Sequence, residues 1–279
     1  IAFIFTYALI KLTSVSIVGD VYVMLAASSI VLLIQVILPP NYSVIRIQDK
    51  KGIVTILVSF YYYIQAVVFL LGYLIATFYL SFNLVSSFLF SVFCMLIGVS
   101  NLFDILFQAK ARLDVFLIGQ VFLSFFKLVG IIFVLSESYS IEKVLLVFVF
   151  SHFFIILYMA FRANEIYGDI FKPVSLKKVY KYVVLSFRIT KDYYLTAFAK
   201  KLFDNSPALV VAPFVSREVI GLFSLYQKCL IFGVSLLRTI ESLLLNRKFI
   251  EFFDNRNIFR IFQISCKAFF ISVNGVKQQ

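Results

Sequence analysis

The residues of this chain that are best placed to do chemistry are ionisable side chains inside long apolar segments. The segment Tyr182–Phe214 carries six of them within seventeen residues, namely Arg188, Lys191, Asp192, Lys200, Lys201 and Asp204. Charged groups inside a membrane are costly, so they usually face a cavity or a partner. On a helix, at about 100° per residue, the first three fall on one arc and the last three on another. This helix therefore has no single polar stripe, and it either lines a basic path or is partly solvated.

The next apolar segment, Ile220–Leu245, has its polar groups on one side. Ser224, Gln227, Arg238 and Glu241 project to that side, and Leu and Ile residues lie opposite. Two interpretations stay open. In one, Arg238 and Glu241 form an ion pair that joins helices or reaches the membrane surface. In the other, this side faces a water-filled cavity with a net basic wall.

Two further polar groups interrupt apolar segments. Lys127 lies within Asp114–Leu135 and has no obvious partner in its own helix. Lining of a cavity and snorkelling to the membrane surface are equally compatible with this position. His152 is the single histidine of the chain, and a packing or hydrogen-bonding role is favoured for it over proton relay.

The chain carries no catalytic motif. There is no Ser/His/Asp arrangement, no HExxH and no glycine-rich phosphate loop. The three cysteines, Cys94, Cys229 and Cys266, lie in apolar segments without metal-like spacing. We therefore expect no enzyme, no metal site and no cofactor, and any transport must be driven by an ion gradient or by the gradient of the substrate itself.

These residues are positioned by a series of apolar segments of membrane-crossing length. Hydrophobic residues make up 62% of the 279 residues and charged residues 14%, compared with about 45–50% and about 25% in soluble domains. About 20 apolar residues in helical form cross a bilayer. We expect nine spans, at Ile1–Leu12, Val21–Leu38, Ile53–Leu80, Leu84–Phe107, Asp114–Leu135, Val144–Phe161, Tyr182–Phe214, Ile220–Leu245 and Ile258–Ser272. The fold class is an all-α, polytopic transmembrane helical bundle.

The short connectors between these spans alternate in charge. The connectors Ile45–Gly52, Gln108–Leu113, Arg162–Lys181 and Asn246–Arg260 together hold 14 Lys and Arg residues, and the four connectors between them hold two. Basic connectors stay in the cytoplasm, so this pattern predicts both membrane residence and orientation. The net charge of +12 then reflects topology and attraction to anionic lipids, and a nucleic-acid partner is disfavoured.

The longest connector suggests a division into two bundles. We expect a first bundle over residues 1–165, a basic cytoplasmic linker over 166–181 and the start of a second bundle over 182–279. Val18-Gly19-Asp20 and Ile220-Gly221 form a faint internal repeat six spans apart, which favours a duplicated transporter architecture. The short first span and the short last segment suggest a fragment of a longer chain.

Four stretches are similar to motifs of one transporter family. Ile17–Tyr22 is similar to the Leu-Gly-x-x-x-Tyr turn between its first two helices, and Leu106–Arg112 is similar to its basic loop between helices four and five. Lys201–Asp204 is similar to its seventh helix with an acidic residue, and Glu218–Lys228 to the Val-Gly-x-Tyr-x-x-Ala-x-Lys start of its eighth. On these stretches the chain resembles the polysaccharide flippases of the multidrug/oligosaccharidyl-lipid/polysaccharide exporter superfamily, which translocate O-antigen or capsule repeats.

The resemblance implies two six-helix bundles that move a polyprenyl-diphosphate-linked oligosaccharide across the bacterial inner membrane by alternating access. The implied partners are this lipid-linked oligosaccharide, membrane lipids and a polysaccharide polymerase. The implied substrate contacts are Lys127, Lys191, Lys200 and Arg238. The residues implied to pair with them or to couple to cations are Asp204, Gln227 and Glu241.

Three alternatives stay open. A drug exporter of the same superfamily more often has acidic cavity residues, whereas the intramembrane charges here are mostly basic. An integral-membrane polysaccharide polymerase or glycosyltransferase needs a sizeable catalytic loop, and the longest connector here has about twenty residues. The third alternative is a membrane scaffold that transports nothing.

Overall fold

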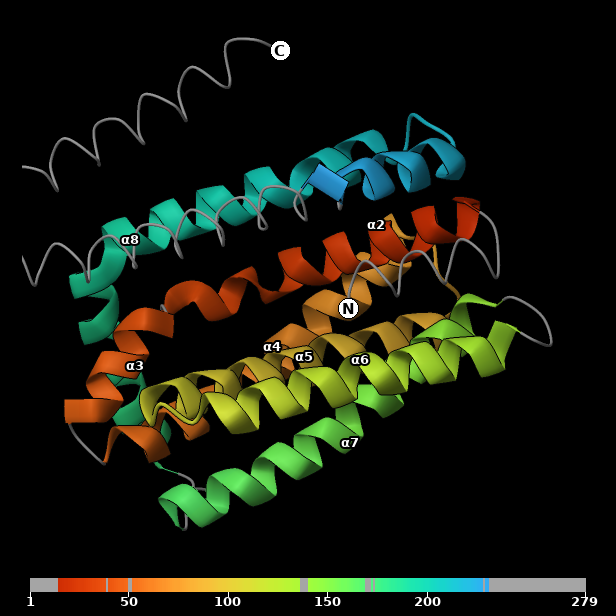
Figure 1. The fold of residues 1–279 in the computed structure, drawn as a ribbon. Coiled ribbons are helices and arrows are strands. Elements are labelled where there is room, and N and C mark those ends of the chain that lie inside the picture. Colours follow the sequence, from red (N-terminus) through yellow and green to blue (C-terminus); the bar gives the residue numbers. More distant parts are fainter. Residues whose placement is uncertain are drawn as a thin grey trace, which may run out of the picture. The chain divides into compact units, whose positions relative to one another are not determined.

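The computed structural model describes residues 15–38, 40–49, 52–135, 140–168, 172, 174–227 and 229–230 (Figure 1). The chain divides into two compact units, Ile1–Leu225 and Tyr226–Gln279. Nearly all described residues belong to the first unit. Every regular element in the described ranges is a helix.

The helices follow one another with short connections. In chain order they are α2 (Val15–Val31), the 3-10 helix η1 (Leu32–Ile37), α3 (Pro40–Asp49), α4 (Ile53–Leu74), the π-helical turn η2 (Ile75–Tyr79), α5 (Leu84–Ala109), α6 (Leu113–Leu135), α7 (Ile141–Tyr167) and α8 (Leu176–Val211). Residues 217–227 are helical as well.

Five helical segments of the described residues are long and apolar enough to cross a membrane. They are Val15–Gln35, Ile53–Tyr79, Leu84–Ala109, Asp114–Phe133 and Ile141–Tyr167. The all-helical fold class is therefore confirmed for the described residues, and these segments indicate a multi-pass membrane protein. The expected count of nine spans stays a prediction, because the spans Ile1–Leu12 and Ile258–Ser272 lie outside the described residues.

The second expected span begins earlier than the sequence suggests. We expect residues 13–20 to form a connector, but α2 already begins at Val15. Asp20 is the residue that suggests a connector, and in the structure its carboxylate pairs with the Arg217 guanidinium at 3.2 Å. Because the charge is partnered, it does not end the helix.

Two expected connectors contain helix. Pro40 occupies the first position of α3, where its missing N–H costs no hydrogen bond, and α3 continues to Asp49 inside the expected connector Ile45–Gly52. In the expected linker 166–181, α7 continues to Tyr167 and α8 begins at Leu176. Only residues 168–175 lie between the two helices. Whether this linker separates two bundles stays a prediction.

The long helix α8 replaces the expected span Tyr182–Phe214. It runs unbroken for 36 residues, which corresponds to roughly 50 Å at 1.5 Å per residue. It is not among the five membrane-crossing segments, since its charged residues interrupt every long apolar stretch. Its buried residues Val179, Ser186, Thr190, Ala208 and Ala212 share the side that packs against α2, η1 and α4.

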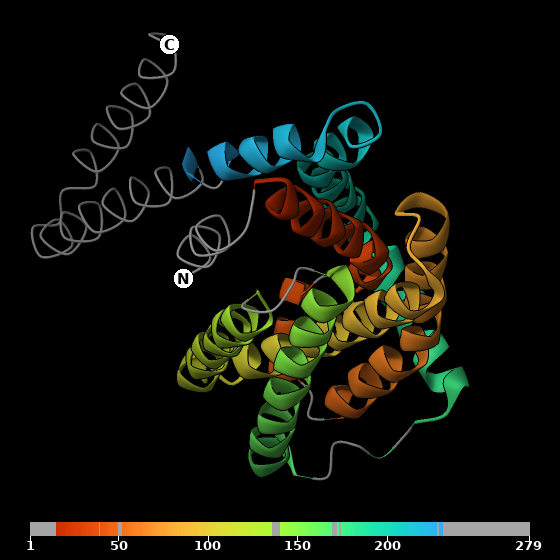
Figure 2. The same cartoon turned by 90° about the vertical axis from the view of Figure 1, so that its right-hand side faces the viewer.

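The helix α5 forms the core of the bundle. It packs most extensively against α4 and α7, and Figure 2 shows it between these two helices. Asn83 caps its N-terminus by accepting a hydrogen bond from the Ser86 N–H at 2.8 Å. Phe90 and Phe93 are fully buried on it. The absence of a side chain at Gly72 lets α4 approach α5 closely at Ser91.

Candidate functional site

An apolar groove lies where the start of α8 meets α4. This cavity has a volume of about 550 Å³, within the range of ligand pockets. The α4–α8 groove is lined by Phe60, Tyr63, Ile64, Leu176, Lys177, Val179, Tyr180 and Val183. Its wall is thus aromatic and aliphatic, with one lysine.

Beside the groove, two hydrogen bonds attach the connector that leads into α8 to α4. The Tyr63 hydroxyl donates a hydrogen bond to the Val174 carbonyl at 3.2 Å, and the Val174 N–H donates one to Ser59 Oγ at 2.8 Å. Ser59 is buried, and both bonds are partly buried. They attach the connector to α4 just before α8 begins at Leu176.

Basic side chains continue from the groove along α8. Lys177, Lys181, Arg188 and Lys191 follow one another at spacings of four, seven and three residues, and all four are exposed. Such spacings place side chains along one side of a helix. The groove and this basic row together have the character of an amphiphile site, with an apolar floor and cationic groups beside it.

The expected site residues on α8 are not brought together. Lys191 belongs to the basic row, whereas Lys200 is exposed nine residues later, which on a regular helix is the opposite side. Asp204 and Gln227 lie in helical backbone. Arg238 and Glu241 lie outside the described residues, so their expected pairing and cavity lining are untested.

Lys127 of α6 lies over an aromatic ring. Its Nζ is 5.0 Å from the centre of the Phe148 ring of α7, and His152 lies on the same helix. His152 is 5% exposed, and neither ring nitrogen has a hydrogen-bond partner within the described residues. The Phe93 ring lies edge-on to it at 5.5 Å. This arrangement agrees with the packing role favoured for His152, and the proton-relay role stays untested.

A cluster of side-chain amides inside the bundle, two of them buried and one partly buried, was missed by the sequence analysis. The Asn101 Nδ2 of α5 donates to the Gln35 Oε1 of η1 at 3.3 Å. The side chains of Gln35 and Gln65 meet at Gly98, where a Cβ atom would collide with them. Both Gln65 amide atoms are buried without a partner in the described part of the chain. The sequence could have indicated this cluster, because each of the three amides interrupts an otherwise apolar span.

At the other end of α8, the two halves of the sequence repeat touch. A Cβ atom on Gly19 would collide with the carbonyl oxygen of Arg217, and one on Gly221 with the carbonyl oxygen of Val15. The Asp20–Arg217 ion pair lies beside this crossing. The repeat was visible in the sequence, but the contact between its two copies was not.

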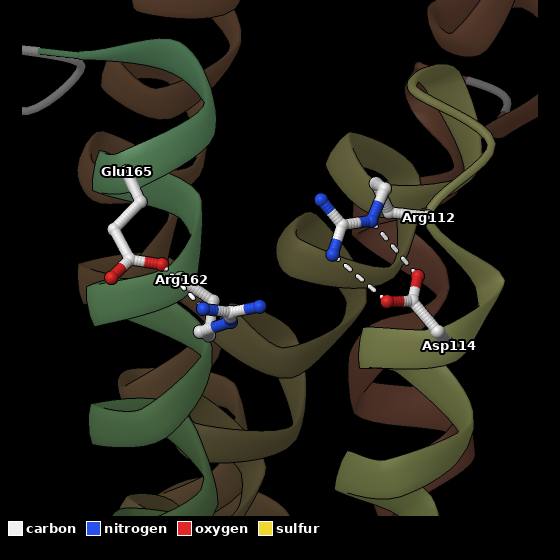
Figure 3. Close-up of polar contacts among 4 residues, drawn as sticks. All are labelled: Arg112, Asp114, Arg162 and Glu165. Carbon is white, nitrogen blue, oxygen red and sulfur yellow. Dashed lines mark hydrogen bonds and ion pairs between the residues drawn. The ribbon is translucent and has the colours of Figure 1, made fainter.

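Two exposed ion pairs lie at neighbouring ends of α6 and α7 (Figure 3). Arg112 donates from Nε and Nη2 to both carboxylate oxygens of Asp114, at 2.9 and 2.8 Å, which raises the pKa of the guanidinium. Arg162 Nη1 pairs with Glu165 Oε2 at 2.6 Å. Exposed pairs of this kind contribute about 0–1 kcal/mol, so we regard them as surface features.

The fold and these sites define the class as a helical, multi-pass membrane protein with polar groups in its interior. Among the described residues, no group of three or more His, Cys, Asp and Glu residues could hold a metal ion.

No protein-family model, curated protein or solved structure matches the chain.

Proposed function

We propose that the protein is a flippase that moves a polyprenyl-diphosphate-linked oligosaccharide from the cytoplasmic to the outer face of a bacterial inner membrane. The cargo is an O-antigen, capsule or similar repeat unit, and a polysaccharide polymerase receives it on the outer side. The movement is alternating access between two bundles of six helices, without a covalent step. The basic connectors lie in the cytoplasm.

The observation that carries this proposal is the α4–α8 groove with its basic row. A lipid-linked diphosphate is an amphiphile, because it joins a long apolar chain to a doubly charged head group. The apolar wall of Phe60, Tyr63 and Tyr180 suits the first isoprene units. Lys177 and Lys181 suit the diphosphate, since nearby cations lower the cost of taking its charge out of water.

Of the expected contact residues that the structure describes, Lys191 alone extends the basic row on α8. Lys127 supplies a cation between α6 and α7. We assign head-group contacts to these two residues and to Lys200 and Arg238. Pairing or coupling to cations is assigned to Asp204, Gln227 and Glu241.

The test is a translocation assay with the double variant Lys177→Gln/Lys181→Gln. In cells that depend on this gene, we expect a several-fold fall in the fraction of lipid-linked repeats that reach the outer face. The control is Arg162→Gln, which removes a basic residue that pairs with Glu165 away from the groove and should leave the fraction unchanged. If deletion of the gene leaves repeats reaching the outer face at the normal rate, the flippase assignment is wrong.

A further inference from the structure

A second cavity lies at the end of the bundle opposite the α4–α8 groove. Its volume is about 430 Å³. The Arg217 cavity, as we name it, is lined by Asp20, Val23, Leu80, Phe82, Ser140, Ile141 and Arg217. These residues come from α2, from the connection before α5, from the start of α7 and from the segment after α8.

Its wall differs from those of the other described cavities. The α4–α8 groove is almost wholly apolar, and so is a cavity of about 370 Å³ between α6 and α7. The Arg217 cavity instead combines a carboxylate, a guanidinium and a hydroxyl with the aromatic ring of Phe82. Ligand pockets typically have this composition, in which a few polar groups are set in an apolar wall.

The charged groups of the cavity balance each other. Arg217 Nε lies 3.2 Å from Asp20 Oδ1, so the pair adds no net charge to the wall. The Arg217 Nη1 is buried without a hydrogen-bond partner in the described residues. A neutral ligand oxygen satisfies this donor without disturbing the pair, whereas an anion would compete with Asp20 for the guanidinium.

The surrounding backbone fixes this wall in place. Gly19 packs directly on the Arg217 carbonyl, which holds Arg217 beside α2. The Tyr79 hydroxyl donates to the Leu209 carbonyl, and Asn83 Nδ2 donates to Glu142 Oε1 at 2.7 Å. These bonds join the ends of the helices around the cavity, so its polar groups are oriented before any ligand arrives.

We propose that the Arg217 cavity binds a neutral, hydroxyl-rich saccharide. Sugar hydroxyls both donate and accept, so they match a carboxylate acceptor and a guanidinium donor that lie side by side. The C–H face of a sugar ring packs on an aromatic face such as that of Phe82. This inference rests on the proposed function, because the glycan is the hydroxyl-rich part of the cargo that must reach this end.

The test is saturation-transfer NMR on the full chain in nanodiscs of phosphatidylethanolamine and phosphatidylglycerol. The probes are maltotriose and N,N′-diacetylchitobiose. We expect saturation of the ring protons of at least one probe. Arg217→Gln should weaken binding about tenfold, since it removes a hydrogen bond from a charged donor. Phe82→Leu keeps an apolar side chain but removes the aromatic face, and it should weaken binding as well.

The control is Arg112→Gln, which breaks another Arg–Asp ion pair, that with Asp114 at the opposite end of the bundle, and should leave binding unchanged. The inference is overturned if neither sugar receives saturation from the wild-type chain. It is also overturned if Phe82→Leu and Arg217→Gln both bind as the wild type does. A chain that translocates lipid-linked repeats but binds neither sugar refutes this site alone. A chain that binds sugar here without translocating refutes the flippase and leaves the site.

Discussion

The ammonium group of Lys127 lies over the ring of Phe148, inside the apolar contact between α6 and α7. A cation over an aromatic face gains part of the stabilisation that it loses on leaving water. The described residues supply no acidic partner within ion-pair distance. The free energy lost when the Lys127 ammonium leaves water is therefore only partly recovered. A charged side chain inside a membrane that is not fully compensated is typical of a functional group.

Replacement of Lys127 by methionine separates function from stability. Lys127→Met should raise Tm by about 2–4 °C, because the side chain no longer has to be desolvated and methionine packs well against rings. Translocation should fall, because a cation on the path is lost. Thermal unfolding in detergent and the translocation assay measure the two effects.

The matched control for this change is Lys110→Met. Lys110 Nζ also lies over a ring, that of Tyr167, at 5.5 Å, but Lys110 is exposed at a helix end. Little change in Tm or translocation is expected there. Equal effects of both substitutions would contradict a special role for Lys127.

Gln65 is an uncharged polar group that, like Lys127, lies inside the bundle without full compensation for its loss of water. It is 6% exposed, and neither end of its amide has a partner in the described ranges. Leaving a buried polar group unsatisfied costs about 1–3 kcal/mol. The side chain therefore weakens the fold wherever no water or ligand satisfies it.

Gln65→Leu should stabilise the fold by about 1 kcal/mol, because leucine of similar length fills the space without unsatisfied polar atoms. Gln108→Leu, on the exposed end of α5, serves as the control and should change little. Both are measured by thermal unfolding. A clear loss of stability in Gln65→Leu would show that the amide binds a group that stabilises the bundle.

At the level of helices, the crossing of α2 with the helical residues 217–221 depends on two glycines. A Cβ atom on Gly19 or Gly221 would collide with a backbone carbonyl, of Arg217 or Val15 respectively. Backbone atoms cannot move aside as the end of a flexible side chain can. These positions therefore determine how closely the two helices approach.

Alanine at Gly19 or Gly221 should lower stability by about 1–3 kcal/mol, because overpacking forces the helices apart. Gly52→Ala is the control, because a Cβ there meets nothing within 4 Å. Its expected effect is a small gain of about 0.4–1 kcal/mol. Proteolysis of the detergent-solubilised protein at rising temperature measures all three. Unchanged stability of both Gly19→Ala and Gly221→Ala would refute the close crossing.

At the scale of the bundle, the α4–α8 groove lies at the start of α8, and Arg217 of the second cavity belongs to the segment that follows the end of α8. The structure contains two apolar clusters along the bundle, one around Leu57, Phe107 and Val179 and another around Phe93, Phe148 and Ala212. The buried amides of Gln35 and Gln65 and the partly buried amide of Asn101 lie between them.

The orientation of this arrangement can be tested on the two ends of α5. In a background without native cysteines, Gln108→Cys should be labelled by an impermeant maleimide only after the cells are permeabilised. Leu84→Cys, which is exposed at the other end, should be labelled in intact cells. The reason is that the basic connector Gln108–Leu113 is expected in the cytoplasm. The reverse labelling pattern would invert the proposed direction of transport.

The limits of the spans that contain α4 and α5 were easier to predict than the polar contacts. The expected limits Ile53–Leu80 and Leu84–Phe107 lie within two residues of the observed segments, because long apolar runs have no other stable state in lipid. The start of α2 was missed, since the neutralisation of Asp20 by Arg217 depends on a residue almost two hundred positions away. The amide cluster was missed for the same reason.

Composition and apolar run length are sufficient to predict helices long enough to cross a membrane, and the side on which the connectors lie stays a prediction from their charge. Each is a local quantity, because transfer of a segment into lipid depends on the sum over its own residues. The meeting of Gly19 with Arg217, of Gln35 with Gln65 and of α4 with the start of α8 depends on tertiary packing. Helices that are equally apolar can pair in many ways, and only shape, small residues and the partnering of polar groups select one of them.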